Sequence, residues 1–262
     1  MATRRAHLRI AVEAAAHAPE PLADAIDRAF DAYCAGALAP DGHGNGAVPR
    51  AQTHYYEFSD RRTWGLAMRR LFVAHPKHAR PDYSRPAQTA YIAGYLAHLA
   101  IDEVFVATLG SLAERGDGEA IVGLAYGVET DWGEDIPELA RGATALEQFR
   151  PDGLETFVRP EHLMEFVMRS GPMAAAKSPG AVRQILVRAA NGNIGLDEAE
   201  AEVNRLIAYA HGTFGPNIGR TFARRARAEV VRRLRSYADG RAARYDARSL
   251  RRTPRALDQA AR

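Results

Sequence analysis

The sequence predicts an all-α protein, and three observations carry that prediction. Apolar residues recur at intervals of three and four through most of the chain, as on the inner face of a helix. Glycine and proline interrupt this pattern at intervals that suit helix ends and connections. No stretch alternates apolar and polar residues as a strand would, and no internal repeat is visible. We therefore expect a multi-helix bundle.

The first part of the chain is expected to hold three helices and one glycine-rich loop. The first helix runs from about residue 5 to residue 18, and its apolar stripe (Ile10, Ala11, Ala14) includes His7, which therefore points toward the core. The second runs from about residue 22 to residue 37. Residues 41–50 contain three glycines and a proline and are predicted to form a loop. A third helix follows Thr53-His54-Tyr-Tyr-Glu57 and buries Trp64, Met68, Leu71 and Phe72.

The helix predicted from Pro86 to Leu109 is the element around which the others are organised. His98 and Asp102 are four residues apart and share one helix face, and Gly94 leaves room one turn earlier on that face. Their neighbours are apolar, and a carboxylate in such surroundings is costly to bury unless it is paired or bound to a cation. An imidazole and a carboxylate so placed suit zinc, although a core histidine hydrogen-bonded to an acid has the same spacing.

Further helices are expected in the second half of the chain, at residues 119–130, 137–149, 160–170, 178–190 and 196–211. A long arginine-rich helix follows Gly215-Pro216 and runs to about Tyr237. Residues 241–262 contain seven arginines against two aspartates. Because this segment has little aromatic content and no base-reading motif, we interpret it as a solvated tail, which argues against nucleic acid as a partner. Residues 1–240 are then a single domain.

Composition limits the kinds of site and location that are possible. With 262 residues, 47% of them apolar, the chain can bury one substantial core. Its single cysteine, Cys34, excludes an intrachain disulfide, so any metal must be held by His, Asp and Glu. No uninterrupted apolar run reaches the ~20 residues of a transmembrane helix. The N-terminus is too polar for a signal peptide, and we expect a cytoplasmic protein.

Five residues with metal-binding side chains occur in apolar or glycine-rich surroundings. They are His7, Asp41, His54, His98 and Asp102. They come from the first helix, the loop after the second, the segment before the third, and the central helix. Antiparallel helices could bring all five to one place, where two metal ions could share a carboxylate.

In these segments the sequence resembles the zinc-dependent phospholipase C family, whose all-α fold is shared with single-strand-specific nucleases. The resemblance is carried by four short motifs in order: His7 in an N-terminal helix, Gly36-Ala-Leu-Ala-Pro-Asp41, Thr53-His54-Tyr-Tyr-Glu57, and Ala93-Gly-Tyr-Leu-Ala-His98-Leu-Ala-Ile-Asp102-Glu103. It covers roughly residues 5–105. It implies a multinuclear zinc site that hydrolyses phosphoesters. Asp41, His54, His98 and Asp102 would hold one ion, and Asp102 would bridge to a second ion that is also held by His7.

The chain departs from the family at two places. Secreted members use the amine of a processed N-terminal tryptophan as a ligand, which this start lacks, so the ion near His7 has fewer protein ligands. The family's remaining zinc takes a histidine six residues after the bridging aspartate, where this chain has Thr108. We therefore do not expect this third zinc site in the form that it has in the family. Weaker substitutes elsewhere are His43, Glu129, Asp131, His162 and His211.

The expected function is metal-dependent hydrolysis of a phosphoester or lipid-like substrate through a water activated by one or two zinc ions, or by another first-row divalent metal. Asp41 would be a ligand or the base that steers this water, two roles suggested for the family's corresponding aspartate. Tyr55, Tyr56, Tyr91 and Tyr95 either pack between helices or form a wall for an apolar substrate. The alternatives are a metal-stabilised scaffold without turnover, different chemistry on the same site, or a nucleic-acid binder.

Overall fold

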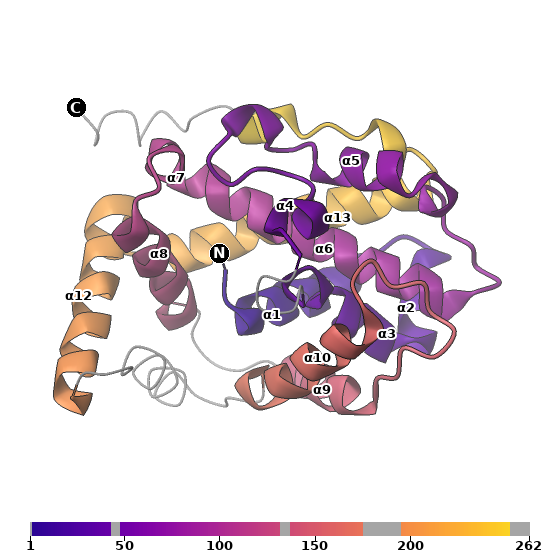
Figure 1. Ribbon diagram of the computed structural model, residues 1–262, viewed down its shortest axis with the longest axis horizontal. Coiled ribbons are helices and arrows are strands. Elements are labelled where there is room, and N and C mark those ends of the chain that lie inside the picture. The colour runs from indigo at the N-terminus through magenta and orange to yellow at the C-terminus, as the bar shows by residue number, and fades with distance from the viewer. Residues whose placement is uncertain (1, 43–47, 132–136, 175–194, 252–262) are drawn as a thin grey trace.

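A computed structural model describes residues 2–42, 48–131, 137–174 and 195–251, which form α-helices, short 3-10 helices and no strand. The prediction of an all-α bundle is confirmed for these residues. The predicted helix at 178–190 lies outside them, as does His43. Figure 1 shows the helices wrapped around α6 (Pro86–Leu109), which runs through the middle of the molecule.

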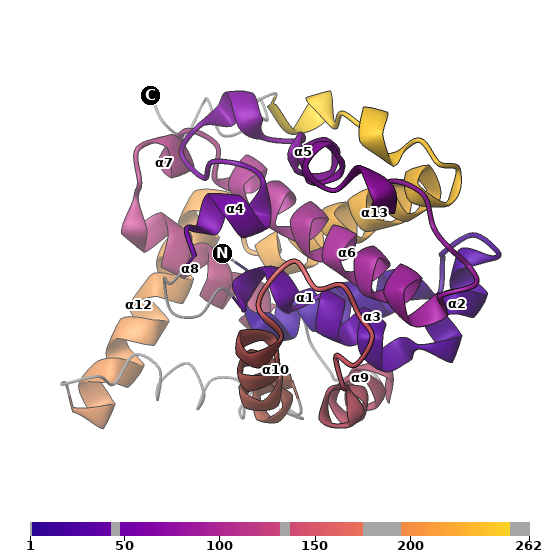
Figure 2. The same ribbon diagram turned by 45° about the vertical axis from the view of Figure 1, so that its right-hand side comes forward.

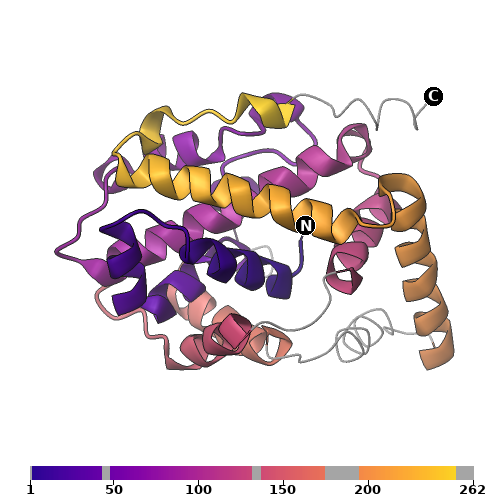
Figure 3. The ribbon, with the colours of Figure 1, turned by 180° about the vertical axis from the view of Figure 1, so that it is seen from behind.

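Helix α6 is apolar on all sides, and a helix of that kind is stable only when other elements cover it. Every residue from 88 to 109 is buried. Helices α2 (Leu22–Arg28) and α3 (Phe30–Gly36) pack on one part of it and α13 (Ile218–Ala238) on another, as Figure 3 shows from behind. By length and composition alone α6 could cross a membrane, but its most apolar window is entirely covered by the protein.

Two glycines bring α3 and α6 into close contact. A Cβ atom at Gly94 would overlap the carbonyl oxygen of Tyr33, and one at Gly36 would overlap that of Tyr91. Gly94 therefore makes room for the backbone of α3. The Tyr33 hydroxyl donates a 2.7 Å hydrogen bond to the carbonyl oxygen of Ala11, which joins α3 to α1 (Arg4–Ala15). Helix α3 is in this way held against both α6 and α1.

Two predicted elements differ from the structure. The helix expected over residues 22–37 is divided into α2 and α3 at Ala29, whose backbone (φ −139°, ψ 53°) is not helical. The segment before the predicted third helix contains a short helix, α4 (Arg50–His54), and the third helix itself is α5 (Ala67–Ala74). The remaining helices in the described parts are η1 (Ala39–Asp41), η2 (Arg61–Thr63), η3 (Pro76–His78), α7 (Ser111–Glu114), α8 (Gly118–Thr130), α9 (Pro137–Gln148), α10 (Pro160–Ala174), α12 (Leu196–Phe214), η4 (Ala242–Arg244) and η5 (Arg248–Arg251).

Residues 242–251 are packed, so the interpretation of the whole C-terminal segment as a solvated tail is wrong for this part. Ala247 donates its backbone N–H to the carbonyl oxygen of Gly65 at 3.1 Å, and Arg251 donates to that of Trp64 at 2.8 Å. Gly65 has φ +78° and no space for a Cβ atom beside Ala247. Leu250 and Ala242 are also buried. The charge pattern missed this contact because it depends on a few small apolar residues between the arginines.

Truncation after Gly240 is expected to lower the melting temperature by about 5 °C or more. Burying one leucine contributes about 1.5–3 kcal/mol, and each kcal/mol shifts Tm by about 2–4 °C in a domain of this size. Deletion of residues 252–262, which removes no contact that we describe, is the control. An unchanged Tm after the longer truncation, measured by calorimetry, would show that residues 242–251 contribute nothing to stability.

Candidate metal centre

The structure brings the five predicted residues to one place. His7 comes from α1, Asp41 from η1, His54 from α4, and His98 and Asp102 from α6. Figure 2 shows α4 beside α6 and close to the start of α1. The side chains of all three histidines and of Asp102 are 0% exposed, and that of Asp41 is 12% exposed. Burial of two carboxylates and three imidazoles in one cluster is costly unless the charges are compensated.

His54 and His98 place their Nε2 atoms close to each other and to both aspartates. The distances are 3.2 Å for His54 Nε2–Asp41 Oδ1, 3.3 Å for His98 Nε2–His54 Nε2, 3.4 Å for His54 Nε2–Asp102 Oδ2, 3.7 Å for His98 Nε2–Asp102 Oδ2 and 3.8 Å for His98 Nε2–Asp41 Oδ1. Donors at the corners of a tetrahedron around zinc are about 3.3–3.6 Å apart, given metal–ligand distances of about 2.0–2.2 Å. His54, His98 and Asp102 therefore fit a divalent metal ion, and Asp41 lies near both rings.

The other carboxylate oxygen of Asp102 faces His7. The distance from His7 Nε2 to Asp102 Oδ1 is 3.2 Å, and neither atom has a hydrogen bond of good geometry. The His7 ring also stacks on that of His98, with centroids 4.0 Å apart and planes at 15°. His7, Asp41 and His98 form a second group of donor atoms within 4.8 Å of one another, which overlaps the group His54, His98 and Asp102. Asp102 can thus serve two neighbouring positions, one through each oxygen.

Each imidazole is oriented by a backbone carbonyl on its far side. The Nδ1 atoms of His7 and His98 lie 2.9 Å from the carbonyl oxygens of Thr3 and Ala37, and Nδ1 of His54 lies 3.2 Å from that of Arg50. A carbonyl oxygen can only accept, so a ring that binds a metal ion keeps its proton on Nδ1. The Nε2 lone pair of such a ring then points into the cluster.

These carbonyls are available because of local helix geometry. His7 and His54 each bond a carbonyl four residues earlier, at the first turn of a helix. Ala37 is the C-cap residue of α3, and the last carbonyls of a helix have no partner within it. The end of α3 therefore orients a histidine of α6, across the contact that Gly36 and Gly94 make possible.

A sixth residue, Arg50, belongs to the cluster and was missed by the sequence analysis. Its Nη2 atom contacts Asp102 Oδ2 and donates a 2.9 Å hydrogen bond to the Tyr56 hydroxyl. The guanidinium carbon lies 4.9 Å from the centre of the Tyr56 ring. The signal in the sequence was the spacing of Arg50 and His54, which are four residues apart and share a face of α4.

Both aspartates are ionised in this environment. Burial alone would raise their pKa, but Arg50 and the hydrogen-bonding histidines hold the pKa of Asp102 well below its usual range. Against the same burial cost, His98 and His54 lower the pKa of Asp41. The cluster therefore presents two negative charges and imidazole nitrogens to a cation.

Arg50 and Asp41 have the most exposed side chains of the cluster, Asp41 at 12%. The Arg50 side chain is 23% exposed, whereas the histidines and Asp102 have no exposed surface. Among the tyrosines considered as a substrate wall, Tyr56, Tyr91 and Tyr95 are buried and pack between helices, and Tyr55 is half-buried. Tyr95 donates a 2.5 Å hydrogen bond to the carbonyl oxygen of Thr53, which supports the residue before His54.

The weaker candidates in the described residues have other partners. Glu129 accepts hydrogen bonds from the backbone of Ala6 and from Arg5, at the start of α1. Asp131 accepts from the backbone N–H of Gly219, at the start of α13, and lies 2.7 Å from Nε2 of His211. His162 is half-buried on α10. None of these four belongs to the donor groups around His98. Thr108 donates to the carbonyl oxygen of Val104.

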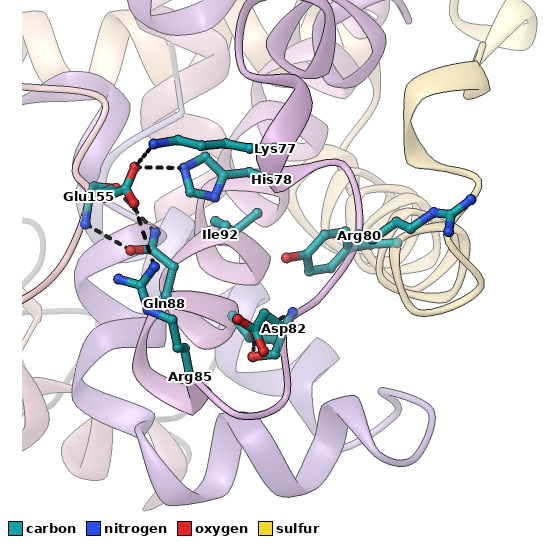
Figure 4. A pocket seen from close by; sticks show the side chains of 10 residues that line it. Lys77, His78, Arg80, Asp82, Arg85, Gln88, Ile92 and Glu155 are labelled. Carbon is teal, nitrogen blue, oxygen red and sulfur yellow. Dashed lines mark hydrogen bonds and ion pairs between the residues drawn. The ribbon is translucent and has the colours of Figure 1, made fainter.

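A separate cavity of about 170 Å³ lies at the N-terminal end of α6, where Figure 4 shows Glu155 facing Lys77, His78 and Arg85. Glu155 pairs with Lys77, with His78 at 3.3 Å and with Arg85 at 3.5 Å. Its backbone N–H donates to the side chain of Gln88 at 2.7 Å. Gln88 and His98 are about 15 Å apart along the helix, given a rise of about 1.5 Å per residue. This cavity is therefore distinct from the cluster, and its ion pairs anchor the segment before α10.

Comparisons with protein-family models, with curated proteins and with solved structures find no match for this chain.

Proposed function

We propose that the protein is a metal-dependent hydrolase that acts on a phosphoester or another anionic, lipid-like ester, with zinc as the preferred ion. The proposal is based on the two carboxylate oxygens of Asp102, which face different partners. Oδ2 lies beside His54, and Oδ1 faces His7. When bound there, divalent ions supply Lewis acidity and lower the pKa of a coordinated water to about 7. The resemblance to zinc-dependent phospholipases C supports the same proposal.

The residues of the cluster would have separate roles in metal binding and in hydrolysis. His54, His98 and the two aspartates hold the first ion, and His7 with Asp102 Oδ1 offers only two protein donors on the other side. Asp41 is the more exposed of the two aspartates, so we assign it the role of accepting a proton from, or orienting, the attacking water. Arg50, which is also partly exposed, brings a fixed positive charge to the place where an anionic ester oxygen would enter.

A phosphoester suits this site because the positive charges of Arg50 and the bound ions would exceed the negative charges of the two aspartates. Two carboxylates are balanced by Arg50 and one divalent ion with one positive charge to spare, and a second ion adds two more. Such a site attracts anionic substrates and stabilises the charge that develops on phosphoryl oxygens. The absence of a histidine at Thr108 means that this proposal involves at most the two ion positions around Asp102.

The second candidate function is a metal-stabilised scaffold. The observation that favours it is that both aspartates lie near His54 and His98, since structural zinc sites are normally closed by four protein ligands. The two candidates differ in whether any substrate reaches the ions from the Asp41 side.

Asp41→Asn is expected to reduce hydrolysis at least ~100-fold while the protein keeps bound metal. The amide keeps the shape of the side chain but can no longer take a proton, and general-base catalysis typically contributes about 10²–10⁴-fold. The measurement is a broad screen of activated phosphoesters and carboxylic esters, run in parallel on both proteins with metal content determined on the same samples. Asp24→Asn, at an exposed position of α2, is the matched control.

Wild-type protein that carries metal and is inactive on the whole panel would favour the scaffold. Activity that Asp41→Asn leaves unchanged would remove Asp41 from the mechanism.

A further inference from the structure

The guanidinium of Arg50 and a metal ion have the same partner, Asp102 Oδ2. This oxygen lies 3.4 Å from His54 Nε2 and 3.7 Å from His98 Nε2. It is also the oxygen that Nη2 of Arg50 contacts. Asp102 is 0% exposed and so cannot recover lost pairing from water. Arg50 is therefore a counter-ion that makes burial of this carboxylate tolerable.

An incoming divalent ion meets a positive charge already in place. The Arg50 guanidinium contacts Asp102, and the Oδ2 atom that it touches also lies beside His54 and His98. A cation bound beside the same carboxylate is repelled by the guanidinium, and the low dielectric of a buried site strengthens that repulsion. Arg50 and the ion thus compete for the same negative charge, whether or not both can touch Asp102 at once.

The Arg50 guanidinium also contacts Tyr56 and Phe58, which lie beside its contact with Asp102. Nη2 of Arg50 already donates to the Tyr56 hydroxyl, and its guanidinium carbon lies 4.9 Å from the Tyr56 ring centre and 6.0 Å from that of Phe58. Aromatic faces stabilise a guanidinium through cation–π attraction. Released from Asp102, the group can stay on these rings at the accessible edge of the cluster.

We propose that Arg50 is a built-in counter-ion that exchanges with the metal. It holds the carboxylates together in the metal-free protein, weakens metal binding by competing for Asp102, and moves its contact to Tyr56 and Phe58 when the site is loaded. This inference rests on the metal-binding part of the proposed function and is independent of whether the site hydrolyses anything.

The test is zinc affinity, measured by competition with chelators of known affinity. Arg50→Gln is expected to bind zinc at least tenfold more tightly than wild type, because the competing charge is gone. Arg50→Lys keeps the charge and is expected to lie within about threefold of wild type. Arg70→Gln is the matched control for the loss of one positive charge, because Arg70 is exposed and its 3.5 Å hydrogen bond goes to the carbonyl oxygen of Tyr55.

A second measurement does not require a substituted protein. The side-chain Nε–H signal of Arg50 is followed by NMR during a zinc titration of the wild type, with the signal assigned from its absence in Arg50→Lys. We expect it to shift in step with zinc occupancy. This readout keeps the inference testable if Arg50→Gln does not fold without metal.

Weaker or unchanged zinc binding by Arg50→Gln would overturn the inference, as would an Arg50 signal that does not respond to zinc. Tighter binding together with an inactive wild type would support the inference and contradict the proposed hydrolase. Wild-type protein that binds no zinc would overturn both.

Discussion

His98→Ala is expected to abolish metal binding and the thermal stabilisation that metal provides. His98 Nε2 belongs to both three-residue donor groups, His54–His98–Asp102 and His7–Asp41–His98, so its loss leaves two donors in each. Its Nδ1 bond to the Ala37 carbonyl is lost as well. A ligand at 100 times its Kd stabilises the folded state by about 2.7 kcal/mol, so wild type should gain about 5–11 °C in Tm on zinc addition and the variant none.

The measurements are elemental analysis after reconstitution and melting curves with and without zinc. His17→Ala is the matched control, since His17 is exposed after the end of α1. Asp102→Ala should lose the metal too, and should also unfold more readily without it, because Arg50 loses its buried partner. Full metal content in His98→Ala, or none in wild type, would contradict the assignment of this cluster as a metal site.

Arg233→Met is expected to destabilise the protein by about 3–5 kcal/mol, the usual cost of breaking a buried ion pair from one side. Arg233 is fully buried on α13 and donates to Glu103 on α6 at 2.5 Å and to Glu229 at 3.0 Å. Glu103 also accepts from the backbone N–H of Ala67, at the start of α5. Arg233 thus joins α13 to α6, and Glu103 holds the start of α5 in turn; removal of the arginine leaves the buried charge of Glu103 without compensation.

Calorimetry against Arg232→Met is the check. Arg232 also pairs with Glu229, but its side chain is 56% exposed, and exposed pairs contribute only about 0–1 kcal/mol. Adding Glu103→Gln to Arg233→Met should recover part of the loss. A loss no larger than that of Arg232→Met would show that the buried network contributes little.

The loss in Arg233→Met should also depend on pH. Burial already raises the pKa of Glu103 in spite of Arg233, and removing the arginine raises it further. A carboxyl with a raised pKa holds more protons when folded, so stability falls as pH rises from about 4.3, the pKa of an unfolded glutamate, through the folded value. The difference between variant and wild type should therefore be smaller at pH 5 than at pH 8.

The helical class and the face shared by His98 and Asp102 followed from the sequence, because residues four apart on a helix lie together in any helical protein. All-round apolar character likewise required α6 to be covered. The five candidate donors were named from the sequence and the structure brings them together, although only a metal measurement tests their role. Zinc, the hydrolase activity and a cytoplasmic location stay predictions.

Other features depended on contacts between distant segments, which periodicity does not encode. In the sequence nothing distinguishes Arg50 from other polar residues. Its contact with Asp102 depends on the packing of α4 against α6. Residues 242–251 look solvated until Gly65 allows Ala247 to approach. The cluster itself depends on the close crossing at Gly36 and Gly94, which puts the Ala37 carbonyl behind His98. Local sequence fixes which way a side chain faces along its own helix, whereas the neighbour it meets is decided by how whole helices pack.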